Sequence, residues 1–128
     1  MKGFVLASVP QRIWALPTDV QQRHRGSDYN VAAWVKVDGY HGDLFLVVQH
    51  VDEAGTHRAV VDRACLKQGE TALPMSGLVN LRFTGGVAGV KVVLAGEQDD
   101  MSYRVDELFM QRTDDKAGPE NKLISNYG

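Results

Sequence analysis

The sequence predicts an all-β fold, a sandwich of two antiparallel sheets. Apolar and polar residues alternate with a period of two in several segments, which is the pattern of half-buried strands. Glycine-rich stretches separate these segments, and helical periodicity is weak throughout. The chain has 128 residues, a length that suits one domain and that buries a core without a disulfide or a metal.

The first third of the chain contains the clearest strand. Residues 1–9 (MKGFVLASV) favour a buried first strand, because their apolar run is too short for a signal peptide. Residues 29–37 (YNVAAWVKV) alternate strictly, so one set of side chains should point into the core. That inward set is Tyr29, Val31, Ala33, Val35 and Val37. The outward set is Asn30, Ala32, Trp34 and Lys36.

The remaining strands follow at short intervals. Residues 44–51 (LFLVVQHV) are apolar on both faces. Asp52 to Gly55 (DEAG) has the chemistry of a hairpin turn and predicts a return strand in HRAVVDRA. Further strands are predicted at 78–84 (LVNLRFT), 90–95 (VKVVLA) and 102–111 (SYRVDELFMQ). The polar stretch after Gln111 has the composition of a linker.

Charge and composition exclude several classes of protein. The net charge of −2, from 14 Lys and Arg against 16 Asp and Glu, argues against broad binding of nucleic acid or anionic lipid. No apolar run approaches the ~20 residues that a membrane helix needs, so no membrane partner is expected. The single cysteine, Cys65, cannot form an internal disulfide and is interpreted as a small buried hydrophobe.

No constellation of residues predicts catalysis, so a non-enzymatic protein is expected. The four histidines, at positions 24, 41, 50 and 57, lack zinc-ligand spacing and cysteine partners. TGGVAGV lacks the Lys-Ser/Thr of a phosphate-binding loop, and no Gly-x-Ser-x-Gly motif occurs. Asp106 and Glu107 are adjacent carboxylates. Neighbours on a strand point to opposite faces, so this pair should not flank one glycosidic bond.

The order of the strands resembles a known family. YNVAAWVKV, LFLVVQHVDEAG, LKQGETALPMSGLVNLRF, VKVVLAG and SYRVDELFMQ are similar to successive segments of the carbohydrate-binding jelly-roll modules of xylanases and cellulases (families four, nine and twenty-two). Those modules read Tyr-x-hydrophobic-x-Ala-Trp-Val-Lys, then Asp-x-x-Gly, and close on Tyr-Val-Asp-Asp-hydrophobic. The resemblance covers residues 4–111 and implies a jelly-roll β-sandwich. The family's Gly-Glu-Trp is Gly69-Glu70-Thr71 here, so one family aromatic is missing.

The resemblance divides the chain into a carbohydrate-binding-like module at 1–112, lacking the family's first strand, and a linker with a further segment at 113–128. The C-terminal ENKLISNYG is similar to the Asn-Leu-Leu/Ile-x-Asn-x-Gly-Phe-Glu with which these modules open. In one explanation, the chain is an excerpt of a tandem array that ends inside the next module's first strand. In the other, residues 121–127 fold back, or exchange with a second copy in a homo-oligomer, and cover the open sheet edge.

Outward-facing aromatic side chains are the candidates for ligand binding. The resemblance assigns Leu44, Leu46 and Val48 to the core, which turns the alternate side chains of that strand outward. If the strands at 29–37 and 44–51 share a sheet, their outward side chains form one apolar patch. The patch consists of Trp34, Phe45, Val47 and Gln49, edged by Lys36. Such a patch suits a sugar, and it suits a protein contact equally well.

Two other segments carry candidate ligand-binding residues by resemblance. Arg12 and Trp14 fall near the positions where these modules place a binding Arg and Trp, although the spacing departs from Gly-Arg-Thr-x-x-Trp. Tyr40 and His41 lie in the loop after the Trp34 strand and are expected at the rim. For Trp14 the alternative is a place in the core, and for Trp34 it is an interface or a loop contact.

The family also implies a structural calcium, although no cofactor is required for folding. These modules hold calcium with an Asp of the closing strand, which matches Asp106, and with oxygen ligands from the opening Asn-x-Gly-Phe-Glu. The glutamate is missing here, which favours weak calcium binding or none. The alternative is that Asp106 is a solvated or hydrogen-bonded carboxylate.

The resemblance therefore implies non-catalytic polysaccharide binding by a module of a larger, secreted bacterial protein, located extracellularly or at the cell surface. Stacking on Trp34 and Trp14 is expected, with polar selection by Lys36, Gln49 and Arg12. The alternative is a structural sandwich that uses the same patch for protein contacts in a multidomain or tail-like assembly. An open groove at Trp34 and Phe45 favours the first function, and a covered one favours the second.

Overall fold

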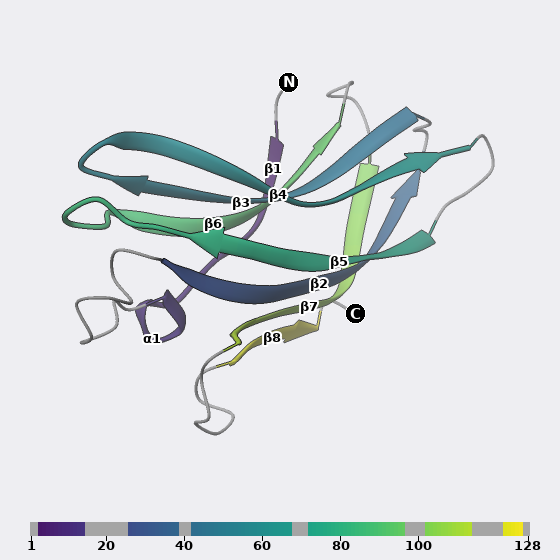
Figure 1. The fold of residues 1–128 in the computed structure, drawn as a ribbon. Coiled ribbons are helices and arrows are strands. Elements are labelled where there is room, and N and C mark those ends of the chain that lie inside the picture. The colour runs from purple at the N-terminus through teal and green to yellow at the C-terminus, as the bar shows by residue number, and fades with distance from the viewer. Residues whose placement is uncertain are drawn as a thin grey trace.

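The computed structural model describes residues 3–14, 26–38, 42–67, 72–96, 102–113 and 122–126. Nearly all of them form strands, and the helix α1 (Gln11–Trp14) is a single turn. The strands make two antiparallel four-stranded sheets packed face to face (Figure 1). The predicted all-β sandwich is therefore confirmed. No helix in this part of the chain is long and apolar enough to span a membrane.

Sheet 1 has the strand order β1-β6-β3-β4. Its strands are β1 (Gly3–Ser8), β6 (Gly89–Gly96), β3 (Gly42–Asp52) and β4 (Gly55–Leu66). β3 and β4 form a hairpin in which Asp52 pairs with Gly55, as the DEAG turn predicts. Gly55 has a φ of 121°, a conformation that only glycine adopts readily. This register places His50 directly opposite His57.

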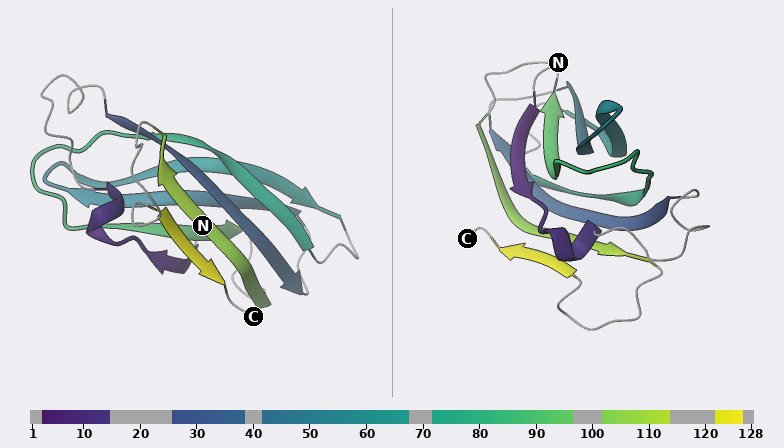
Figure 2. Two further views of the ribbon diagram at one scale, coloured as in Figure 1. Left: turned by 90° about the horizontal axis from the view of Figure 1, so that it is seen from below. Right: turned by 90° about the vertical axis from the view of Figure 1, so that its left-hand side faces the viewer.

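Sheet 2 has the strand order β5-β2-β7-β8. Its strands are β5 (Ala72–Leu81), β2 (Ser27–Asp38), β7 (Ser102–Arg112) and β8 (Lys122–Asn126). The four strands lie side by side in this order in the left view of Figure 2. β8 pairs antiparallel with β7 of the same chain, so it occupies the sheet edge in the way that a folded-back segment would. Exchange of this segment between copies stays a prediction.

The core lies between the sheets and follows the predicted alternation. Every side chain of the inward set of β2 is buried, and so are Leu44, Leu46 and Val48 of β3. Cys65, predicted to be buried, is exposed. Alternation along β4 gives the inward position to Leu66, which is 2% exposed, and turns the neighbouring thiol outward.

β5 differs most from the prediction, since it spans Ala72–Leu81 instead of 78–84. Pro74 lacks an N–H group and argues against a strand from sequence alone, but β5 is an edge strand, where proline is tolerated. Gly77 of β5 lies against β4, because a Cβ at Gly77 would lie 2.2 Å from the carbonyl oxygen of Val61. The two sheets therefore approach each other closely along β4 and β5.

Candidate functional site

The predicted patch of Trp34, Phe45, Val47 and Gln49 does not form. It required β2 and β3 to share a sheet, but β2 lies in sheet 2 and β3 lies in sheet 1. The chain crosses from one sheet to the other between these two strands, so their outward faces lie on opposite sides of the sandwich. Trp34 and Lys36 therefore belong to one outer face, and Phe45 and Gln49 belong to the other.

Trp34 lies beside a shallow hollow on the outer face of sheet 2. Its side chain pairs across the sheet with Pro74 of β5 and Glu107 of β7. Two residues earlier in β2, Ala32 pairs with Ser76 and Phe109. These six residues line a hollow of about 220 Å³, which we call the Trp34 groove. The small Ala32 side chain leaves space between the larger side chains around it, and 43% of Trp34 is exposed.

A β-bulge shapes one end of the Trp34 groove. Trp34 pairs with Glu107 while the next residue, Val35, pairs with Val105. Asp106 is therefore an extra residue in β7, and a bulge of this kind turns two successive side chains to one face. Asp106 contacts the outward side chain of Lys36, and Glu107 lines the groove. The prediction that these two carboxylates point to opposite faces is therefore wrong.

Asp106 is the centre of a small charge cluster next to the groove. Lys36 Nζ lies 3.1 Å from Asp106 Oδ2, and Arg104 Nε lies 3.2 Å from Asp106 Oδ1. Asp106 is therefore a carboxylate paired with cationic side chains, as the alternative to calcium ligation predicted. Structural calcium at Asp106 stays a prediction, and the ion would compete with both cationic side chains for the carboxylate oxygens.

The other predicted ligand-binding residues of β3 lie on the outer face of sheet 1. The guanidinium of Arg63 lies 5.7 Å from the centre of the Phe45 ring, and Arg58 Nε donates a 2.9 Å hydrogen bond to Gln49 Oε1. Val47, predicted to point outward, is only 4% exposed. It alternates with the core residues Leu46 and Val48 and lies in an apolar row between Val93 and Val60 of the neighbouring strands.

Trp14 has a structural role at one end of the sandwich. Its indole Nε1 donates a 3.0 Å hydrogen bond to the Val9 carbonyl oxygen, and its ring meets Phe83 edge-on at 5.9 Å. It packs against the buried core, which is the alternative to ligand binding that the sequence offered for Trp14. The backbone of Arg12 belongs to α1, but its side chain lies outside the described part of the structure, as do Tyr40 and His41.

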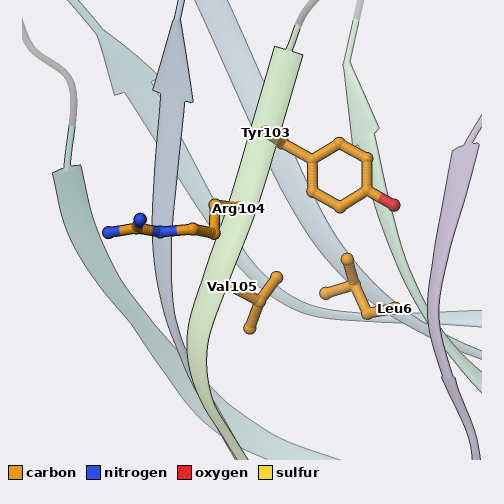
Figure 3. Close-up of a pocket in the computed structure, with 4 residues that line it drawn as sticks. All are labelled: Leu6, Tyr103, Arg104 and Val105. Carbon is orange, nitrogen blue, oxygen red and sulfur yellow. The ribbon is translucent and has the colours of Figure 1, made fainter. Parts of the chain in front are cut away.

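A second hollow, of about 260 Å³, lies where β1 and β7 face each other (Figure 3). Leu6, Tyr103 and Val105 point toward it, whereas Arg104 points the opposite way (Figure 3). Leu6 and Val105 are buried core residues, so this hollow is an extension of the core. Its aromatic lining residue, Tyr103, is partly buried and packs against the core, whereas Trp34 is an exposed ring.

Three titratable side chains converge at the tip of the β3–β4 hairpin: His50, Asp52 and His57. The rings of His50 and His57 stack at 4.7 Å, and Asp52 accepts a 2.9 Å hydrogen bond from the Thr84 N–H group. This Thr84 hydrogen bond is the largest cause that lowers the pKa of Asp52 to about 2. Burial lowers the pKa of His50, and the adjacent His57 lowers it further.

Sequence reasoning missed the cluster of His50, Asp52 and His57 and the residues that surround Trp34 in its groove. The His50 cluster was predictable, since a hairpin closed by Asp52 and Gly55 necessarily places His50 opposite His57. The signal was the turn motif combined with the register that it imposes. Phe109 and Pro74 carried no comparable signal, because their proximity to Trp34 depends on which distant strands pair with β2.

No family model, curated protein or solved structure matches this chain. The resemblance to carbohydrate-binding jelly-roll modules therefore stays a prediction from the sequence segments, and the Trp34 groove is the structural feature that bears on it.

Proposed function

We propose that this chain is a non-catalytic carbohydrate-binding module that binds polysaccharide at the Trp34 groove. The observation that carries the proposal is a pair of aromatic residues, Trp34 and Phe109, on one sheet face, with the small Ala32 side chain next to both. An aromatic ring offers a flat apolar surface against which the C–H face of a sugar ring can stack. The jelly-roll kinship and the placement in a larger secreted protein belong to the same proposal.

Polar groups at the groove suit hydroxyl ligands. Glu107 supplies a carboxylate acceptor, and Ser76 supplies a hydroxyl group that both donates and accepts. Lys36 adds a hydrogen-bond donor at the end of the groove nearest Asp106. A sugar hydroxyl both donates and accepts hydrogen bonds, so a surface with both kinds of group around an apolar ring can orient it.

The size of the groove favours an extended chain over an enclosed small molecule. Its volume of about 220 Å³ lies below the ~300–1,000 Å³ of a typical small-molecule pocket. A hollow on an open sheet face therefore suits one or two residues of a polysaccharide that continues across the surface.

The two carboxylates beside the groove are poorly arranged for catalysis. Asp106 and Glu107 share a face, but both Asp106 oxygens are engaged by Lys36 and Arg104. A glycosidase needs one carboxyl group as acid and a second as nucleophile or base on either side of the bond. Asp106 is already committed to its two cationic neighbours and is a poor candidate for either role.

A glycan array tests the proposal, with Trp34→Ala and Phe45→Ala compared against the wild type. Phe45 is the matched control, because it is an aromatic residue on the outer face of the other sheet. Trp34→Ala should lower the affinity at least ~tenfold, since a central aromatic contact contributes more than about 1.4 kcal/mol. Phe45→Ala should leave binding unchanged. Circular dichroism establishes that both variants are folded. Equal losses in both variants, or no glycan binding by the wild type, would contradict the proposal.

One observation favours the second function, a protein contact on the same face. Leu78 of β5 is 63% exposed and pairs with Asn30, an outward residue of β2. Together with Trp34 it gives the face two large exposed apolar side chains. If Leu78→Ser abolishes self-association or partner binding and no glycan binds, the face is a protein interface.

A further inference from the structure

We propose that His50, Asp52 and His57 bind one divalent transition-metal ion of the zinc class at the tip of the β3–β4 hairpin. His57 Nε2 lies 2.9 Å from Asp52 Oδ1, and His50 Nε2 lies 3.4 Å from Asp52 Oδ2. One ligand atom from each of the three residues lies within 4.8 Å of the other two. This site lies in sheet 1 and is independent of the Trp34 groove in sheet 2.

His50 is the observation that points to a ligand. It is only 6% exposed, between the edge-on ring of Phe83 and the stacked ring of His57. Within the described part of the chain, neither of its ring nitrogens makes a hydrogen bond of good geometry. Its polar neighbours are the Asp52 carboxylate, 3.4 Å from Nε2, and the backbone of Arg82. Leaving a buried polar group unpaired costs about 1–3 kcal/mol, and native structures rarely do so. A metal ion bound at Nε2, beside the Asp52 carboxylate, would satisfy that nitrogen.

Asp52 is positioned as a ligand needs to be. Its Oδ1 accepts the Ala54 N–H group and its Oδ2 accepts the Thr84 N–H group, each at 2.9 Å. These two hydrogen bonds fix the carboxylate plane, which is how outer partners orient metal ligands. Capping of the hairpin turn by itself explains the position of Asp52. It does not explain why a second histidine, His50, is buried against the same carboxylate without a hydrogen bond of good geometry.

The distances are close to those of a zinc site. Zinc bonds of about 2.0–2.1 Å in tetrahedral geometry place neighbouring ligand atoms roughly 3.3 Å apart. The two histidine–aspartate distances are 2.9 Å to Oδ1 and 3.4 Å to Oδ2 of Asp52. All three ligand atoms lie within 4.8 Å of one another, so small side-chain rotations would bring them to this spacing. The His57 side chain is 42% exposed, so its ring can rotate to complete the geometry while His50 and Asp52 stay in place.

The donor set selects the class of ion. Two imidazole nitrogens and one carboxylate oxygen suit zinc, copper, nickel and cobalt, whereas calcium and magnesium prefer oxygen ligands. Three protein ligands leave at least one coordination position for water or another small ligand.

Metal titration of the full-length, untagged protein tests the inference. One equivalent of Zn²⁺ should raise the melting temperature, since an ion that binds only the folded state stabilises it. Co²⁺ should produce the visible absorption of a nitrogen- and oxygen-ligated site. His57→Gln should weaken Zn²⁺ binding at least ~tenfold, which corresponds to about 1.4 kcal/mol, and should diminish both signals. His41→Gln is the matched control and should behave as the wild type, and Ca²⁺ should cause no shift that depends on His57.

Three results would overturn the inference: no Zn²⁺-dependent shift in the wild type, an undiminished shift in His57→Gln, or an equal shift with Ca²⁺ that His57→Gln removes. His50→Gln should also lose binding. If that variant does not fold because it alters the core, the comparison of His57→Gln with His41→Gln decides the question, since His57 is exposed.

Discussion

Replacing Gly77 with alanine should destabilise the protein, against the usual direction of a glycine-to-alanine change. The φ of Gly77 lies outside the left-handed region, so its backbone conformation is open to any residue. At such a position alanine normally stabilises by about 0.4–1 kcal/mol, because it restricts the unfolded chain. From the conformation of Gly77 alone, the free energy of unfolding should rise.

The packing at Gly77 reverses this expectation. An added Cβ would lie 2.2 Å from the Val61 carbonyl oxygen, whereas ordinary contact begins at 3.4 Å. β4 and β5 would have to separate by the difference, about 1.2 Å, and overpacking of this kind costs about 1–3 kcal/mol. The obstructing atom belongs to the backbone, so no side-chain rotation relieves the clash.

Urea unfolding measures the effect. With an m-value of about 2 kcal/mol/M, a loss of about 2 kcal/mol lowers the midpoint by roughly 1 M. Gly89→Ala is the matched control, because Gly89 also lies in a strand with φ outside the left-handed region and nothing lies within 4 Å of its added Cβ. Gly77→Ala should also weaken glycan binding, since β5 supplies Pro74 and Ser76 to the Trp34 groove. An unchanged or raised midpoint for Gly77→Ala would refute the close approach of β4 and β5.

Two further predictions concern pH and the C-terminal strand. In the folded state the pKa of His50 is lowered from 6.5, and the pKa of Asp52 is lowered from 3.8 to about 2. The unfolded state therefore binds more protons at low pH, and acid destabilises the fold. The metal-free protein should therefore lose stability as pH falls below 6.5, and lose more between 3.8 and about 2. Asp52→Asn should remove the loss between 3.8 and about 2. A urea midpoint that stays constant below pH 6.5 would contradict the prediction. Truncation after Thr113 removes β8 and exposes the edge of β7, so the truncated chain should self-associate in light scattering while the full chain stays monomeric. A dimeric full chain that becomes monomeric on truncation would instead indicate strand exchange.

The sequence predicted the inside of this fold better than its outside. Strict alternation in β2 correctly identified the inward set, every second residue from Tyr29 to Val37, as core positions, because a period of two can bury only one side of a strand. The DEAG turn likewise fixed the β3–β4 hairpin. Both features depend on neighbours in sequence, and local pattern contains that information.

The candidate site depended on information that local pattern lacks. Nothing in residues 29–51 states that β2 and β3 lie in different sheets, so the patch of Trp34 and Phe45 was assembled from strands that do not meet. The bulge at Asp106 has no signature in SYRVDELFMQ, yet it reversed the expected orientation of a carboxylate. Trp34 itself was correctly placed outward, while its aromatic neighbour proved to be Phe109 of β7.

The indole N–H signals of the two tryptophans provide the most direct measurement of ligand recognition by Trp34. In a ¹⁵N-labelled sample titrated with cellulose- and xylan-derived oligosaccharides, the Trp34 signal should shift and saturate. The Trp14 signal should stay fixed, because its indole N–H group is already bonded to the Val9 carbonyl oxygen. Trp34→Phe assigns the two signals. A saturable shift at Trp14 instead, or no shift at either indole with any oligosaccharide, would contradict sugar recognition by the outer face of sheet 2.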